Sequence, residues 1–292
     1  MLMSITSIMF RKTAKKSDDA RDAGLTTPQD IERFDDIVYG ENEEWNVLDV
    51  YRPKAEMSRN LPVIVSVHGG GWVYGDKERY QYYCMSLAQR GFAVVNFTYR
   101  LAPEYKFPAP LEDTNAVMEW IYENAPDYGL DIEHIYMLGD SAGANILALY
   151  TAICTNSSYA ANFNFHVPGG FVPKAIALNC GSYVPTDNMP TKALMADYLP
   201  KKGTEEELKL NNPLHYITEK YPPVYVMTSN GDFLKGQAPM MVEVLKEKGI
   251  PHVMKCYGDE KTELSHVFHC NIKLPEANVC NDEECEFFKS WK

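Results

Sequence analysis

A serine stands in the middle of the stretch Gly139-Asp140-Ser141-Ala142-Gly143, where the local sequence changes from strand-like to helix-like. The apolar run 135–138 before it is typical of a buried strand. The small, apolar residues from 142 to about 153 after it favour a helix. Glycines on both sides of the serine leave room where a tight turn brings strand and helix together. The pattern predicts that Ser141 projects from the edge of a sheet, above the positive end of a helix.

A second glycine-rich stretch, His68-Gly69-Gly70-Gly71-Trp72, directly follows the apolar run 61–67, which is typical of a central strand. Consecutive glycines cost backbone entropy, so they indicate a place where bare N–H groups must be closely approached. Acyl transfer needs such donors, because its tetrahedral intermediate carries negative charge on the former carbonyl oxygen. We predict that the N–H groups of Gly70, Gly71 and Ala142 form an oxyanion hole. The neighbours expected to support the site are His68, Gly69, Trp72 and Asp140.

Together these motifs resemble the hormone-sensitive-lipase-type family of α/β-hydrolases, the bacterial esterase and acetyl esterase group. The matching segments are 68–72, 99–104, 107–113 and 139–143, in that order. The resemblance implies an α/β fold of the α/β-hydrolase type, with a mostly parallel eight-stranded sheet, helices on both faces and a small cap. It also implies a serine hydrolase that requires no metal and no organic cofactor. Two positions depart from the family pattern, Ala144 after the serine turn and the run 233–235 after Asp232.

The base that activates the serine is sought downstream, because this fold orders its catalytic residues as serine, acid and histidine. A serine hydroxyl needs such a base, and the base needs an orienting carboxylate. His252 begins a strand-like run, 252–257, whereas His266 and His269 lie just beyond that run. The segment 265–268 resembles the family's His-x-Phe signature, so we select His266 over His269.

The predicted acid is Asp232, which directly follows a strand-like run ending in a turn, 223–231. Ligand-facing groups of open α/β sheets gather at the carboxyl ends of the strands. An ordinary turn or helix-capping aspartate is the alternative interpretation of Asp232. Asp259 and Glu260 compete for the role, but they lie only a few residues before His266 and lack that placement.

Two segments fall outside the alternating strand and helix pattern. Basic residues follow the first apolar residues of the chain, whereas a secretory signal carries its charges before them. From the resemblance we expect residues 1–35 to form an N-terminal cap segment, residues 36–292 the catalytic domain, and residues 182–221 a cap insertion of irregular structure. Some residues of the insertion would either line an acyl or alcohol pocket or pack the cap onto the body; these are Met189, Met195, Tyr198, Leu199 and Tyr216.

Composition narrows the class of protein and its partners. A chain of 292 residues is long enough for one large α/β domain. A net charge of −12 argues against nucleic acid or an anionic membrane surface as a partner. Seven cysteines without a Cys-x-x-Cys pair favour reduced thiols over disulfides or a metal site. We therefore expect a cytoplasmic protein without stable membrane association, and a homodimer stays open.

The function that these residues predict is hydrolysis of small, short-chain acyl esters by a serine carboxylesterase. Ser141 would attack the ester, His266 would take its proton, and Asp232 would orient the histidine. The small-molecule ester is the only partner that this chemistry requires. An amidase or formamidase could use the same triad. A non-catalytic ligand-binding protein on a hydrolase scaffold is the alternative outside enzymes, because fold does not fix function.

Overall fold

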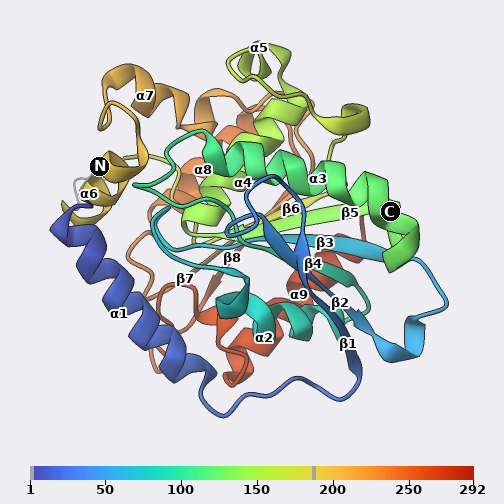
Figure 1. Ribbon diagram of the computed structural model, residues 1–292. Helices are drawn as coiled ribbons and strands as arrows, with labels where there is room; N and C mark the ends of the chain where they lie inside the picture. The colour runs from blue at the N-terminus through green and yellow to red at the C-terminus, as the bar shows by residue number, and fades with distance from the viewer. Residues whose placement is uncertain (1–2, 186–188) are drawn as a thin grey trace.

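The computed structural model describes residues 3–185 and 189–292, and in these residues eight strands form one mixed sheet (Figure 1). The strand order across the sheet is β1-β2-β4-β3-β5-β6-β7-β8. β2 pairs antiparallel with both β1 and β4, and all other neighbours are parallel. The strands are β1 (Ile31–Val38), β2 (Val47–Pro53), β3 (Leu61–Val67), β4 (Ala93–Phe97), β5 (Leu130–Asp140), β6 (Ile176–Asn179), β7 (Val224–Ser229) and β8 (His252–Tyr257).

Helices cover both faces of the sheet, as the fold prediction requires (Figure 1). The α-helices are α1 (Ile5–Asp22), α2 (Lys77–Ala88), α3 (Ala109–Tyr128), α4 (Ala142–Thr155), α5 (Ser157–Ala160), α6 (Met189–Tyr198), α7 (Glu205–Leu210), α8 (Gln237–Glu247) and α9 (Pro275–Lys289). α3, α4 and α8 contribute to one apolar core, and α2 and α9 contribute to the other. Of the helices that the structure describes, none combines the length and the apolar character needed to cross a membrane.

The two cores follow from the alternation of side chains along the central strands. In β3, Val63 and Val65 belong to the core under α3 and α4, whereas Ile64 between them belongs to the core under α2 and α9. Strands that are buried on both faces appear in a sequence as continuous apolar runs, and residues 61–67 form such a run. The α/β-hydrolase fold predicted from the sequence is confirmed.

Several predicted boundaries agree with the structure, and others are displaced. The runs 61–67 and 252–257 coincide with β3 and β8. The helix predicted from 142 to about 153 extends to Thr155, and the apolar run 135–138 is part of a longer strand, because β5 starts at Leu130.

The expectation of an irregular stretch over 182–221 is wrong, since α6, α7 and a 3-10 turn at Pro213–His215 occupy much of it. α7 carries a helix-start signal, a capping box in which Thr204 and Glu207 each bond the other's backbone N–H. Before the sheet, the chain forms α1, which packs against α6. The first strand starts at Ile31, so the predicted boundary at residue 35 falls inside β1. Parts of both predicted cap segments, 1–2 and 186–188, lie outside the described residues.

Candidate active site

Ser141 occupies the turn between β5 and α4, where the sequence places it. Its backbone has φ 53° and ψ −115°, a conformation that residues with a side chain rarely adopt. The flanking glycines are required by close packing. A Cβ atom at Gly139 would lie 2.7 Å from the carbonyl oxygen of Gly143, and one at Gly143 would clash with the carbonyl oxygen of Val67. At this turn, α4 therefore packs closely against both β5 and β3.

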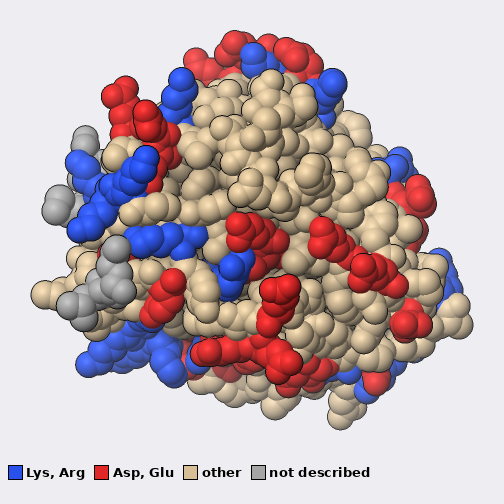
Figure 2. Space-filling model, turned by 45° about the horizontal axis from the view of Figure 1, so that its top comes forward, with Lys and Arg blue, Asp and Glu red and all other residues tan. Residues whose placement is uncertain are grey.

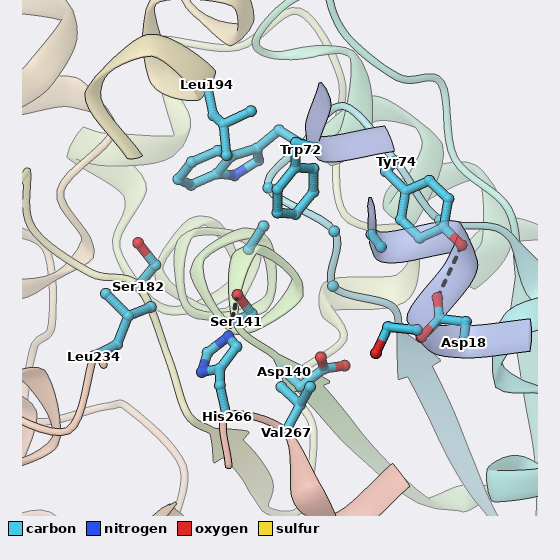
Figure 3. Close-up of a pocket in the computed structure, with 18 of the residues that line it drawn as sticks. Asp18, Trp72, Tyr74, Asp140, Ser141, Ser182, Leu194, Leu234, His266 and Val267 are labelled. Atoms are coloured by element: carbon cyan, nitrogen blue, oxygen red, sulfur yellow. Dashed lines mark hydrogen bonds between the residues drawn. The ribbon is translucent and has the colours of Figure 1, made fainter. Parts of the chain in front are cut away.

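The structure brings Ser141, His266 and Asp232 together from three separate parts of the chain. Figure 3 shows His266 beside Ser141. His266 Nε2 lies 3.0 Å from Ser141 Oγ, and His266 Nδ1 lies 2.7 Å from Asp232 Oδ1. Asp232 follows β7 and His266 lies in the loop after β8. A parallel bridge between Gly231 and Ser265 joins these two loops next to both residues.

Asp232 is buried and richly hydrogen-bonded. Besides His266, the Thr228 hydroxyl and the Leu234 N–H each donate to its carboxylate at 2.8 Å. Burial alone raises the pKa of this carboxyl, but the hydrogen bonds and the neighbouring imidazole outweigh it and hold the pKa of Asp232 below its ordinary value. The carboxylate is thus kept ionised where it can fix the His266 tautomer and stabilise an imidazolium. The departure from the family pattern at 233–235 leaves this geometry in place.

The competing acid and base residues lie in other environments. His269 is fully buried in a 3-10 turn, with its Nε2 3.5 Å from Cys270 Sγ, and burial lowers its pKa to about 3. Among the contacts of the described residues, none joins His269 to Ser141. Asp259 is exposed and accepts the N–H groups of Lys261 and Thr262 at 2.8 Å, as a turn residue does. Glu260 beside it is also exposed.

The glycine-rich loop after β3 supplies backbone donors beside the serine. Gly70 and Gly71 have positive φ, 115° and 59°, and a Cβ at Gly70 would clash with the carbonyl oxygen of Tyr74. Both glycines line the cavity that contains Ser141, and within the described part of the chain their N–H groups bond no protein acceptor. The N–H of Ala142, at the first position of α4, has no acceptor within its own helix. These three donors are the ones predicted for the oxyanion hole.

Two aromatic stacks hold this loop in place. His68 is buried and stacks on Tyr99 with ring centroids 4.0 Å apart, while its Nδ1 lies 2.7 Å from the carbonyl oxygen of Gly69. Burial lowers the pKa of His68 to about 4, so the ring is neutral near pH 7. Trp72 stacks on Tyr198 of α6 at 5.2 Å. These residues position the loop, whereas no hydrogen bond among the described residues links them to Ser141.

Asp140, the residue before Ser141, links the glycine-rich loop to the serine turn through hydrogen bonds of Tyr80. The Tyr80 hydroxyl donates to Asp140 Oδ2 at 2.8 Å and accepts from the Gly69 N–H at 3.0 Å. Burial raises the pKa of Asp140 to about 6. A Cβ at Gly69 would lie 2.5 Å from that carboxylate, so only glycine fits there. The arrangement fixes the distance between the donor loop and Ser141.

Two groups of side chains within the described residues could supply three metal ligands each, with ligand atoms within 4.8 Å of one another. One contains Asp140, His269 and Cys270, and the other contains Cys180, Asp232 and His266. In the second group the imidazole already bonds Asp232 and Ser141. The hydrolytic chemistry that this geometry supports uses that imidazole as a base.

A cavity of about 260 Å³ opens beside Ser141, roofed by α1 and α6. Figure 3 shows Leu194 and Trp72 on one side of it, Leu234 and Ser182 on another, and Asp18 with Tyr74 on the α1 side. Phe233, 62% exposed, lies with its ring 4.4 Å from the His266 ring. Lining residues that sequence reasoning missed include Phe10, Ala14, Asp18, Leu194 and Phe233. A four-residue repeat along α1, starting at Phe10, is the signal that could have found the first three.

The residues that the sequence suggested either as pocket walls or as packing residues are packing residues where the structure describes them. Met195, Tyr198 and Leu199 are buried in the apolar core, and Tyr216 packs against it. None of these four lines the cavity beside Ser141. The Met189 side chain lies outside what the structure describes. These residues thus pack the segment 194–216 onto the body of the protein.

Comparison with known proteins places this geometry among esterases. The BD-FAE family model matches residues 48–235. Esterase LipQ of Mycobacterium tuberculosis is 27% identical over 242 residues, which cover 77% of this chain and 57% of that protein. Carboxylesterase NlhH of the same organism is 30% identical over 202 residues, covering 65% of this chain and 62% of its own length. The chain thus spans about three fifths of these curated relatives.

Solved structures agree over nearly the whole chain. Esterase B from Lactobacillus rhamnosis superposes with a TM-score of 0.89 at 25% identity, covering 98% of this chain and 95% of the other. A hyperthermophilic esterase from the archaeon Pyrobaculum calidifontis has a TM-score of 0.78 at 25% identity, covering 97% and 93%. The overall fold of the chain is therefore shared with these structures.

Proposed function

The chain belongs to the BD-FAE family and to the hormone-sensitive-lipase-type esterases of the α/β-hydrolase fold, and from this membership we propose that it is a serine carboxylesterase for small, short-chain acyl esters. The observation that carries the proposal is the continuous hydrogen-bonded relay from Ser141 through His266 to Asp232, with distances of 3.0 Å and 2.7 Å. Ser141 and His266 line a cavity, and the N–H groups of Gly70 and Gly71 in its wall have no acceptor among the described residues.

In the proposed mechanism, Ser141 Oγ attacks the ester carbonyl carbon while His266 Nε2 takes the hydroxyl proton. Backbone N–H groups of Gly70, Gly71 and Ala142 bind the oxyanion that forms. The tetrahedral intermediate collapses as His266 gives its proton to the leaving alcohol, which leaves an acyl-enzyme. A water molecule, deprotonated by His266, then hydrolyses the acyl-enzyme and restores Ser141.

The size of the cavity supports a short acyl chain. Each methylene buried contributes about 0.8 kcal/mol until the available space is full. The cavity of about 260 Å³ beneath α1 and α6 limits the length of the acyl chain that it can hold. We expect kcat/KM to peak for acyl chains of about two to six carbons. A series of p-nitrophenyl esters from acetate to palmitate measures this, and rates that climb to the longest chains would contradict the cap assignment.

The decisive test replaces the nucleophile. We expect Ser141→Ala to lower kcat/KM for p-nitrophenyl butyrate by at least about 10⁴-fold, as loss of a triad member does. Ser182→Ala is the matched control, since this buried serine lines the same cavity and has no described contact with His266. The control should stay within about tenfold of wild type, because removing one hydroxyl away from the reacting atoms disturbs only binding. Wild-type turnover in Ser141→Ala would refute the proposal.

Two further measurements separate the alternatives. A fluorophosphonate probe labels an activated serine covalently, so wild-type protein that stays unlabelled would favour the non-catalytic binding protein. Matched ester and amide substrates with the same acyl group separate a carboxylesterase from an amidase or formamidase, since the same triad serves both reactions.

A further inference from the structure

α1 turns apolar side chains toward solvent. Ile5, Ile8 and Met9 are 77%, 54% and 62% exposed. Their spacing of three and four residues puts them side by side on one face of the helix. Figure 1 shows α1 at the edge of the molecule, with one side free of other elements. Three large apolar residues together on an otherwise polar surface indicate a surface that contacts something apolar.

The side of α1 that faces the body carries both apolar and polar contacts. Phe10 packs against the apolar core, with its ring 6.5 Å from the Tyr74 ring. The Ser4 N–H and the Ser7 hydroxyl both donate to the Asp197 carboxylate of α6, at 3.0 Å and 2.6 Å. Further along, the Arg11 guanidinium donates to the carbonyl oxygens of Val73 and Ala102 at 2.6 Å and 2.8 Å. Phe10 and these polar contacts therefore dock the helix, whereas Ile5, Ile8 and Met9 on its outer face stay largely exposed to solvent.

Lysines continue the same outward face. Lys12 and Lys16 follow Ile5 at helical spacing, both are exposed, and neither forms an ion pair within the described part of the chain. Figure 2 shows several basic side chains at the left of the molecule, with acidic side chains among them. The chain as a whole is acidic, with net charge −12. Salt screens the charges that lie more than about 10 Å from an approaching surface. The charges that such a surface feels at the outer face of α1 are therefore mainly those of these lysines.

We propose that the outer face of α1, formed by Ile5, Ile8, Met9, Lys12 and Lys16, binds an anionic lipid surface. The apolar side chains would enter the boundary between headgroups and acyl chains, and the ammonium groups would contact lipid phosphates. This proposal revises the expectation drawn from net charge, because the local charge is opposite in sign. A second copy of the chain fits less well. A standard protein interface uses about 20–30 residues on each side, and a second copy would bring its own lysines against these.

The position of the face has a consequence for the candidate active site. The opposite side of α1 lines the cavity beside Ser141 with Phe10, Ala14 and Asp18. Binding through the outer face would hold one wall of that cavity at the lipid surface. This consequence rests on the proposed function, whereas the binding itself does not.

Vesicle flotation of the full chain tests the binding. We expect wild type to float with phosphatidylcholine vesicles that contain about one third phosphatidylglycerol, not with pure phosphatidylcholine, and to detach at about 0.5 M salt. The variants Ile5→Ser/Ile8→Ser/Met9→Ser and Lys12→Glu/Lys16→Glu should each lower vesicle affinity at least about fivefold. The matched controls are Met240→Ser/Val279→Ser, exposed apolar residues of α8 and α9, and Lys220→Glu/Lys246→Glu.

Three outcomes would overturn the proposal. The first is that wild type does not bind the anionic vesicles. The second is that the control variants lose as much vesicle affinity as the face variants. The third is that sedimentation shows a concentration-dependent dimer, which the face variants abolish. The face variants should hydrolyse dissolved p-nitrophenyl acetate at the wild-type rate, because none of their residues lines the cavity. Ser141→Ala should bind vesicles as wild type does, so failure of the lipid face and failure of the hydrolase proposal are distinguishable.

Discussion

At the scale of single residues, the proposed mechanism depends on the negative charge of Asp232. Asparagine would keep its shape but lose its charge, and it would favour the wrong tautomer of His266. We expect Asp232→Asn to lower kcat for p-nitrophenyl butyrate by about 10³- to 10⁴-fold. The exposed turn residue Asp259 is the matched control, and Asp259→Asn should retain kcat. Equal losses in the two variants would remove Asp232 from the orienting role.

A second residue-scale prediction concerns Glu284 of α9, which is fully buried in the core beneath the sheet. It accepts a hydrogen bond from Asn179 Nδ2 at 2.7 Å, with the Tyr83 hydroxyl at 3.5 Å, yet burial raises its pKa from 4.5 to about 7. Between these values the folded chain keeps a proton that the unfolded chain has released. The free energy of unfolding therefore falls as pH rises through this window.

Glu284→Gln removes this ionisation while keeping a similar shape. The free energy of unfolding of the variant minus that of wild type should increase by about 1–3 kcal/mol from pH 4.5 to pH 8. Urea unfolding at the two pH values measures the gain. A difference between variant and wild type that is the same at both pH values would contradict the raised pKa.

At the scale of elements, α6 sets one wall of the cavity through Leu194, whose Cδ1 lies beside Gly71. Leu194→Ala removes three carbons from that wall. We expect the acyl chain with the highest kcat/KM to lengthen by about two carbons, because each added methylene now finds space. The next residue, Met195, is buried in the core instead, and Met195→Leu is the volume-matched control. The prediction fails if the optimum moves equally in both variants, or in neither.

The local sequence predicted those helices and strands that contain a long apolar run or a distinctive turn motif. β3 and α4 are long apolar runs beside glycine-rich turns, and the triad candidates follow strand ends in a fixed order. α6 (Met189–Tyr198) and α7 (Glu205–Leu210) are short, so no long apolar run in the sequence marks them. The capping box at Thr204 was the available signal for α7. The place of Phe10 in the cavity depends on how α1 docks through Asp197 and Val73, contacts between distant parts of the chain that no local pattern contains.

At the scale of the whole molecule, all seven cysteines are free and only Cys256 is exposed. Burial raises the pKa of buried thiols such as Cys84 and Cys285, which slows their reaction further. We expect one thiol to react quickly with Ellman's reagent in the native protein, and all seven in guanidinium without reductant. Fewer than seven in guanidinium would reveal a disulfide. The cytoplasmic location stays a prediction from sequence, and the question of a homodimer stays open.

The backbone at Ser141, with φ 53° and ψ −115°, has a consequence for how such a chain evolves. Holding a residue with a side chain in a rarely populated conformation costs about 1–3 kcal/mol of folding stability, and glycine avoids most of that cost. A population of variants selected for heat resistance alone would therefore drift toward glycine at position 141 and lose the hydroxyl. Only selection that includes turnover retains the serine, so activity and thermal resistance oppose each other at this single position.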